Sequence, residues 1–152
     1  MKKLYILLLV IFLSVNIFSQ KQDSYVIEKR AALTIGIMQG GGSLVGVDFE
    51  AMIGQKFAAQ VGAGAFGFGA GLNYHFKPSV RSSFLSLQYW HQGLGSAYYQ
   101  AVVGPTFVYR FRKLFTAQLG LGYRVEEGPS FNSSLTPSPI MLLYSIGIYF
   151  PL

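Results

Sequence analysis

A regular alternation of apolar residues with polar or small residues constrains this chain more than any other feature. It is clearest in LFTAQLGLGYR, residues 114–124. Read with a period of two, one face of this stretch carries Phe115, Ala117, Leu119, Leu121 and Tyr123. On the other face Thr116, Gln118, Gly120, Gly122 and Arg124 follow one another. An aromatic residue at each end with aliphatic residues between is what a lipid-facing strand needs, so the stretch predicts a β-strand with one oily face.

The same alternation recurs along most of the chain, with turn residues between the segments. The further predicted strands cover residues 31–37, 45–53, 57–63, 66–76, 84–90, 98–111 and 140–150. Most of these segments approach the roughly 9–11 residues with which a tilted strand crosses a bilayer. Eight is also the smallest number of strands in known transmembrane barrels. We therefore predict an all-β fold, an eight-stranded antiparallel up-and-down transmembrane β-barrel over residues 31–152.

The predicted connections follow from glycine, proline and the apolar register. We expect a turn at Gly40–Gly42, a three-residue loop at 54–56, a two-residue loop at 64–65 that places Ala63 opposite Phe66, loops at 77–83, 91–97 and 125–139, and a bulge at Gly104–Pro105. Because the strand count is even, both chain ends lie on one side of the barrel. Placing them in the periplasm makes the loop at 125–139 external.

Composition narrows the class of protein further. Of 152 residues, 51% are hydrophobic, 12% are charged and none is cysteine, which excludes disulfides, thiolate metal sites and a lipid-modified cysteine. Lys2 and Lys3 precede an apolar run at 4–13, which predicts a cleaved signal peptide over residues 1–19. Residues 20–30 are then a polar periplasmic lead-in. The net charge of +6 would suit nucleic acid in a cytosolic protein, but a secreted chain is not expected to meet it.

Aromatic side chains gather at the predicted strand ends, as the two interfaces of a membrane require. At the expected periplasmic edge the girdle comprises Phe57, Tyr74, Phe76, Tyr109, Phe111, Phe115 and Phe150, and at the outer edge Tyr89, Tyr99 and Tyr123. A soluble periplasmic barrel of the lipocalin kind would have the opposite pattern, with an apolar interior that binds a ligand. That reading remains an alternative.

The whole region 31–152 resembles the small eight-stranded outer-membrane barrels of Gram-negative bacteria, of the OmpX and OmpA-barrel type, and the wider group of porin-family β-barrel domains. Its closing segment YSIGIYFPL is similar to their C-terminal assembly signal, although it ends in Pro151–Leu152 and not on an aromatic residue. The resemblance implies the cell outer membrane as location, membrane lipids and the barrel assembly machinery as partners, a monomeric state, and no cofactor.

The predicted interior contains five ionisable residues, Asp48, Glu50, His75, Arg110 and Arg124. In a narrow barrel they form a network of paired buried charges, because unpaired charges there are costly. The alternative is a polar pathway through a narrow pore. No second histidine shares the face of His75 at ligand spacing, so no metal site is expected.

Enzymatic activity is the remaining alternative. Some eight-stranded outer-membrane barrels modify lipid A and carry a histidine, a serine and an acidic residue near the outer rim, and His91, Ser96 and Glu126 are the residues here that could approach that rim. No motif surrounds them. The expected role is therefore structural or one of surface interaction, without a catalytic site.

Overall fold

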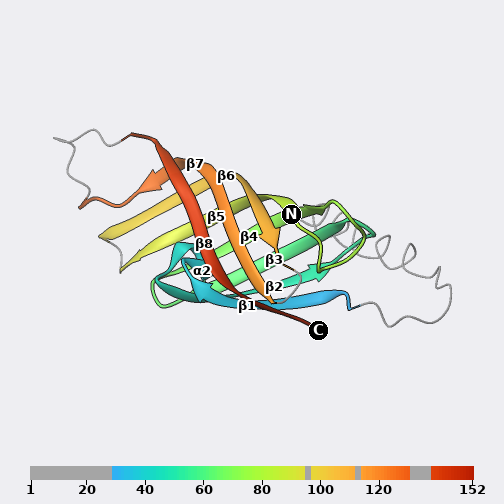
Figure 1. The fold of residues 1–152 in the computed structure, drawn as a ribbon. Helices are drawn as coiled ribbons and strands as arrows, with labels where there is room; N and C mark the ends of the chain where they lie inside the picture. The colour runs from blue at the N-terminus through green and yellow to red at the C-terminus, as the bar shows by residue number, and fades with distance from the viewer. Residues whose placement is uncertain (1–28, 95–96, 112–113, 131–137) are drawn as a thin grey trace, which may run out of the picture.

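The computed structural model describes residues 29–94, 97–111, 114–130 and 138–152. Within them eight strands form one closed barrel in which each strand pairs with its sequence neighbours (Figure 1). The strands are β1 (Ala31–Ile37), β2 (Val45–Met52), β3 (Phe57–Gly64), β4 (Gly67–His75), β5 (Phe84–Leu94), β6 (Tyr98–Arg110), β7 (Phe115–Glu127) and β8 (Ile140–Pro151). The predicted all-β, eight-stranded antiparallel up-and-down barrel is thus confirmed. The signal peptide expected at 1–19 lies outside the described residues, as does the lead-in up to residue 28.

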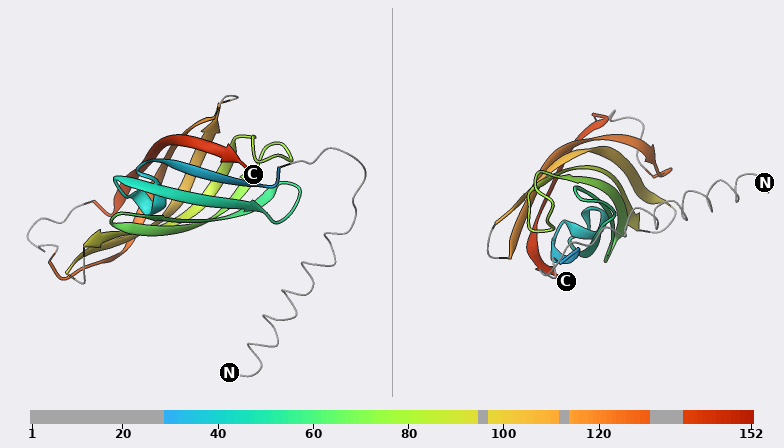
Figure 2. Two further views of the ribbon diagram at one scale, coloured as in Figure 1. Left: turned by 90° about the horizontal axis from the view of Figure 1, so that it is seen from below. Right: turned by 90° about the vertical axis from the view of Figure 1, so that its right-hand side faces the viewer.

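The barrel closes between its first and last strands. β1 and β8 are antiparallel, with Leu33 opposite Phe150 and Ile37 opposite Ile146. The described chain therefore begins and ends at the same end of the barrel, which we call the terminal end (Figure 2). It also carries the connections at 53–56 and 76–83, the end of β6 and the start of β7. The distal end carries the connections at 38–44 and 65–66, the ends of β5 and β7, and the starts of β6 and β8.

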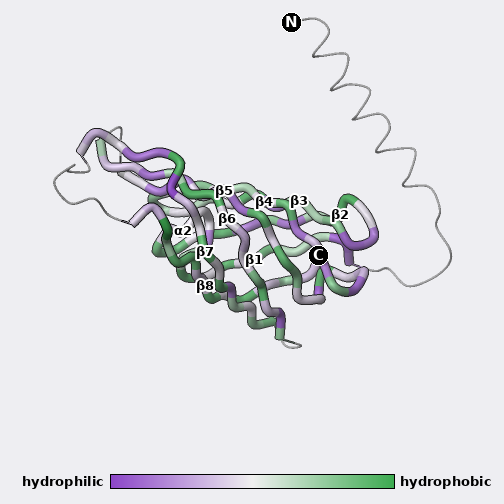
Figure 3. The backbone as a smooth tube through the Cα atoms, turned by 90° about the horizontal axis from the view of Figure 1, so that it is seen from above, coloured by the Kyte–Doolittle hydropathy of each residue, from purple (hydrophilic) through white to green (hydrophobic). Residues whose placement is uncertain are grey.

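The alternation of the sequence becomes an alternation between an exposed and a buried face. On β8, Leu142, Tyr144 and Ile146 are more than half exposed, whereas Leu143 and Ser145 between them are buried. Figure 3 shows apolar and polar positions alternating along the strands. Because successive side chains of a strand point to opposite faces, the apolar residues cover the outside and the polar residues fill the lumen. No helix in the described residues is long and apolar enough to span a membrane.

A short helical segment, α2 (Gln39–Gly42), fills the distal part of the lumen (Figures 1 and 2). The predicted turn at Gly40–Gly42 falls within α2, between β1 and β2, and all four residues of α2 are buried inside the barrel. The φ angles of Gly40 and Gly41, 64° and 77°, are in the left-handed region that glycine adopts without strain. Hydrogen bonds to the wall hold the segment, among them Gly40 N–H to Asp48 Oδ2 at 3.0 Å.

Glycines of the neighbouring strands make room for α2. A Cβ atom on Gly69 would lie 3.0 Å from the Cα of Gly41, and one on Gly62 would lie 3.0 Å from the Cα of Gly40. A narrow barrel alone would favour glycine at inward positions. The structure gives a more specific reason for Gly62 and Gly69, because the backbone of α2 occupies the space that larger side chains would take.

Gly46 provides a test of this packing. A Cβ atom there would lie 2.6 Å from the carbonyl carbon of Gln39 and 2.9 Å from the nitrogen of Gly40, both backbone atoms. We expect Gly46→Ala to lower the free energy of unfolding by about 1–3 kcal/mol, the usual cost of overpacking. Urea unfolding of the refolded barrel measures this. Gly54→Ala is the matched control, because its Cβ would meet only the Cβ of Phe57, at 3.9 Å, and a similar loss in both variants would contradict the packing argument.

Four local predictions are corrected by the strand bounds and the register. β5 and β7 continue to Leu94 and Glu127, beyond the predicted ends at residues 90 and 124. The turn between β3 and β4 places Ala63 opposite Phe68, not Phe66, because Gly64 and Gly67 still pair. The predicted bulge at Gly104–Pro105 is wrong. The irregularity lies between Ala101 and Val102, whose partners on β7 are Glu126 and Arg124, so Val125 is the additional residue.

Candidate functional site

Three of the predicted lumen charges meet near the terminal end. The Glu50 carboxylate contacts His75 Nε2 through one oxygen and Arg110 Nη2 through the other, the latter at 2.6 Å. Each residue comes from a different strand, β2, β4 and β6 respectively. All three are buried. A buried carboxylate is tolerable only when charges and hydrogen bonds compensate it, and this cluster supplies both. We call Glu50, His75 and Arg110 the lumen triad.

Aromatic rings and a loop enclose the guanidinium group of the triad. The Cζ of Arg110 lies 4.9 Å from the ring centroid of Phe84 and 4.6 Å from that of Tyr149. Cation–π contacts of this kind are strongest where water is excluded. Arg110 Nη1 also donates to the carbonyl oxygen of Val80, whose side chain is fully buried. The loop at 76–83 therefore folds over the terminal end and closes the lumen above the triad.

Asp48 and Arg124 lie outside the triad. Asp48 binds the backbone of α2, as described above. Arg124 lies toward the distal end, where its Nη1 is 2.9 Å from Glu127 Oε2. The structure therefore divides the five predicted lumen charges among three places.

A neutral hydrogen-bonded chain occupies the middle of the lumen. Trp90 Nε1 and Gln118 Nε2 both donate to Gln88 Oε1, each at 2.7 Å. Ser145 Oγ donates to Gln118 Oε1 at 3.4 Å and accepts from Gln39 of α2 at 3.0 Å. The sequence analysis predicts the charged residues of the lumen but not this hydrogen-bonded chain. The sequence does contain a sign of it, because glutamine and serine recur at inward positions of these strands.

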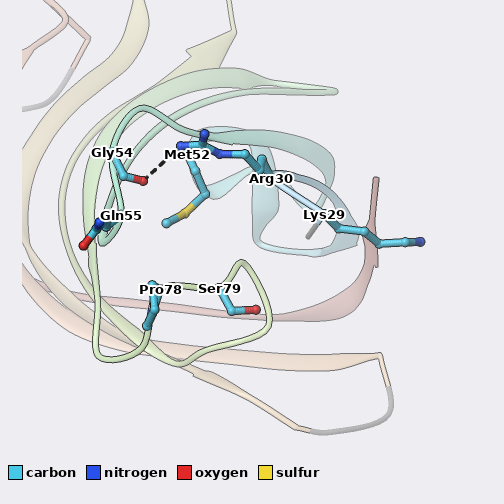
Figure 4. A pocket seen from close by; sticks show the side chains of 7 residues that line it. All are labelled: Lys29, Arg30, Met52, Gly54, Gln55, Pro78 and Ser79. Atoms are coloured by element: carbon cyan, nitrogen blue, oxygen red, sulfur yellow. Dashed lines mark hydrogen bonds between the residues drawn. The ribbon is translucent and has the colours of Figure 1, made fainter. Parts of the chain in front are cut away.

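A small pocket of about 160 Å³ opens at the mouth of the terminal end (Figure 4). Its lining comprises Lys29, Arg30, Met52, Gly54, Gln55, Pro78 and Ser79. Arg30 Nη2 donates to the carbonyl oxygen of Gly54 at 3.3 Å, and Lys29 Nζ donates to that of Pro151 at 2.9 Å. Lys29 and Arg30 thus lie at the mouth, and backbone carbonyls anchor both cations.

Of the residues singled out for enzymatic activity, His91 and Glu126 lie on the outside of the distal end. The His91 ring is stacked between Phe68 and Tyr99, with centroid distances of 4.8 and 5.4 Å. Within the described residues Glu126 accepts a hydrogen bond from Tyr99 Oη at 3.0 Å and none from His91. Ser96 lies outside the described residues. The structure therefore shows His91 packed among aromatic rings, with its Nδ1 3.5 Å from Tyr89 Oη, and Glu126 bound to Tyr99.

The ten aromatic residues of the predicted girdle all lie at outward-facing positions or strand ends. Eight of the ten are at least two-fifths exposed, and Tyr89 and Tyr99 are half-buried beside His91. The rings of Phe57 and Tyr74 lie tilted to each other near the terminal end, with centroids 5.3 Å apart. Tyr89 lies deeper than Tyr99, since it pairs with Ala70 and Val103 in the middle of β5. Phe66 and Phe68 add to the distal edge and were not identified from the sequence.

The described residues contain no group of three or more histidine, cysteine, aspartate or glutamate side chains that could hold a metal ion. No family model matches the chain, and no curated protein or solved structure matches it. The part of the resemblance to small outer-membrane barrels that the structure supports is the closed eight-stranded antiparallel architecture.

Proposed function

We propose that this chain is an integral outer-membrane β-barrel with a structural or surface-interaction role. The observation that carries the proposal is the apolar outer surface. Large hydrophobic side chains of every strand are exposed there, including Ile35, Phe49, Val61, Leu72 and Leu87, while the lumen holds the buried polar groups. In water such a surface would be far larger than the apolar patches of soluble monomers. Lipid is the solvent that suits it.

A soluble lipocalin-like barrel is supported less well. Such a barrel needs an apolar interior that leaves room for a ligand and a polar exterior. Here the interior contains the lumen triad, the glutamine chain and α2, and the exterior is apolar.

A narrow pore is also less well supported. α2 fills the distal lumen, Trp90, Val102 and Leu143 pack together within it, and Val80 covers the terminal end. An open channel would require all three obstructions to move.

The remaining parts of the proposal rest on the sequence. The signal peptide predicts export, and the C-terminal segment predicts recognition by the barrel assembly machinery. The protein then resides in the cell outer membrane as a monomer in contact with lipid. The role is non-catalytic, because His91 is packed between aromatic rings and Glu126 is bonded to Tyr99.

Gel migration tests the proposal directly. The outer-membrane fraction of cells that express the full chain is run in detergent with and without boiling. A closed barrel without edge strands resists detergent until it is heated, so we expect the unboiled protein to migrate differently from the boiled one. Recovery of the protein in the soluble periplasmic fraction, with no heat-dependent shift, would reject the proposal.

A further inference from the structure

A hollow of about 690 Å³ lies on the outside of the terminal end, where the loop at 76–83 meets the ends of β4 and β6. Its lining residues are Phe76, Lys77, Ser79, Arg81, Ser82, Ser83, Tyr109, Arg110 and Phe111. The same loop that closes the lumen with Val80 thus forms one wall of a surface pocket, which we call the rim pocket.

One wall of the rim pocket is aromatic. Phe76, Tyr109 and Phe111 are each nearly half exposed. The rings of Tyr109 and Phe111 meet edge to face, with centroids 4.5 Å apart. All three belong to the aromatic girdle of the terminal end and adjoin the apolar outer surface through Phe107, whose ring lies 6.1 Å from that of Phe76. This wall is suited to the start of an acyl chain.

The loop at 76–83 adds two cations, Lys77 and Arg81, to the lining, and serines hold this loop in place. Ser82 Oγ accepts from the backbone nitrogen of Lys77 at 2.9 Å, and Ser79 Oγ accepts from that of Arg81 at 3.3 Å. Ser83 Oγ accepts from the backbone nitrogen of Arg110 at 3.1 Å, which ties the loop to β6. Within the described residues the charged groups of Lys77 and Arg81 have no hydrogen-bond or ion-pair partner. Two cations are therefore presented on a braced loop beside the aromatic wall.

The exposed charges of the barrel are also distributed unevenly, with the cations at the end that carries the rim pocket. Among the described residues, the exposed charged side chains of the terminal end are all positive: Lys29, Arg30, Lys56, Lys77 and Arg81. The exposed carboxylate side chains, Glu126 and Glu127, lie at the distal end. A membrane surface that meets the terminal end is therefore matched best if it is anionic.

We propose that the rim pocket binds the headgroup of an anionic glycerophospholipid of the leaflet that faces the terminal end. The lipid phosphate lies between Lys77 and Arg81, and the first part of an acyl chain lies against Phe76, Tyr109 and Phe111. This inference rests on the proposed function, since only a membrane-inserted barrel holds its rim at the level of lipid headgroups. The pocket would fix the depth and orientation of the barrel in its membrane.

Native mass spectrometry of the full refolded chain in an uncharged detergent tests the site. The protein is titrated with phosphatidylglycerol, phosphatidylcholine, lipid A and inorganic phosphate in turn. We expect phosphatidylglycerol to bind about tenfold more tightly than phosphatidylcholine, and the double variant Lys77→Gln/Arg81→Gln to lose about tenfold in phosphatidylglycerol affinity. Inorganic phosphate alone is expected to compete poorly, because it makes no contact with the aromatic wall.

Lys56→Gln is the matched control. Lys56 is a cation of the same rim that lies 6.0 Å from the ring of Tyr74, but it does not line the pocket. We expect it to change the affinity by less than about twofold. An equal loss in Lys56→Gln and in the double variant would overturn the site in favour of a diffuse charge effect, and no preference for phosphatidylglycerol would overturn it outright.

The remaining outcomes distinguish a glycerophospholipid from lipid A and from free phosphate. They also distinguish failure of this inference from failure of the proposed function. Tighter binding of lipid A with the same dependence on Lys77 and Arg81 would overturn the assignment to a glycerophospholipid, and equal binding of free phosphate would overturn the assignment to a lipid. The heat-dependent gel shift is measured on the same preparations. A barrel that shifts but does not select phosphatidylglycerol disproves this inference alone, whereas a protein that neither shifts nor enters the membrane fraction disproves the proposed function.

Discussion

Replacing Arg110 by methionine is expected to lower the free energy of unfolding by about 3–5 kcal/mol. The change removes the cation that lies 2.6 Å from Glu50 and the donor that satisfies the carbonyl oxygen of Val80. The carboxylate then stays buried with His75 as its only remaining side-chain partner in the described residues. Methionine fills much of the same volume between Phe84 and Tyr149, so the loss is electrostatic in origin and not a cavity effect.

Urea unfolding of the barrel refolded into lipid vesicles measures this loss. Arg81→Met is the control, because Arg81 is exposed at the same end and has no ion pair in the described residues, and it should change stability by about 0.5 kcal/mol or less. In the double variant Glu50→Leu/Arg110→Met much of the loss should be recovered, since neither charge is left unpaired. If Arg110→Met costs no more than Arg81→Met, the triad does not stabilise the fold.

The sequence predicts which face of each strand a residue occupies, because a period of two leaves no other choice once one face must be apolar. The neighbours of Glu50 and Arg110 are therefore enough to predict that both point inward. The same rule predicts Leu119 outside and Gln118 inside, and both lie so in the structure. Strand number and antiparallel order followed from the turn residues between the alternating segments.

Alternation does not predict which inward charges meet, because that depends on the stagger between strands. Along the hydrogen-bonded rows Glu50 pairs with Gln60, and Gln60 pairs with Gly71, four residues from His75 on β4. His75 nevertheless contacts Glu50. Strands of a closed barrel are tilted relative to its axis, so residues at the same height are offset in register. The sequence does not contain that offset, so it predicts one network of five charges and not the separate sites of the structure.

The sequence also does not predict that α2 lies inside the lumen. Three consecutive glycines indicate a turn wherever they occur, and nothing local distinguishes a turn in solvent from one inside a barrel. The glycines at 46, 62 and 69 were a possible signal, since they line one patch of the lumen and need a backbone to fill it. Only the paired strands show that these positions are neighbours of the loop at 38–44.

Replacing Leu119 by lysine is the variant that tests the membrane directly, and we expect it to lower the free energy of unfolding in vesicles by about 2–4 kcal/mol. Leu119 lies on the outside of β7 between Phe107 and Tyr144, and it is 58% exposed. In a barrel surrounded by water, an exposed leucine can be exchanged for lysine at a cost of about 0.5 kcal/mol or less. In a barrel surrounded by lipid, the ammonium group must leave water at the middle of the belt.

Two controls make the Leu119→Lys result specific to lipid. Gln55→Lys adds the same charge to an exposed turn of the terminal end, outside the apolar belt, and should leave the free energy of unfolding within about 0.5 kcal/mol of wild type. Leu119→Ala removes side-chain area without adding charge, so any larger loss in Leu119→Lys reports the cost of the charge. Equal stability of Leu119→Lys and Gln55→Lys would mean that water reaches residue 119. A protein partner would then have to cover the apolar surface, because neither lipid nor the protein's own core covers it.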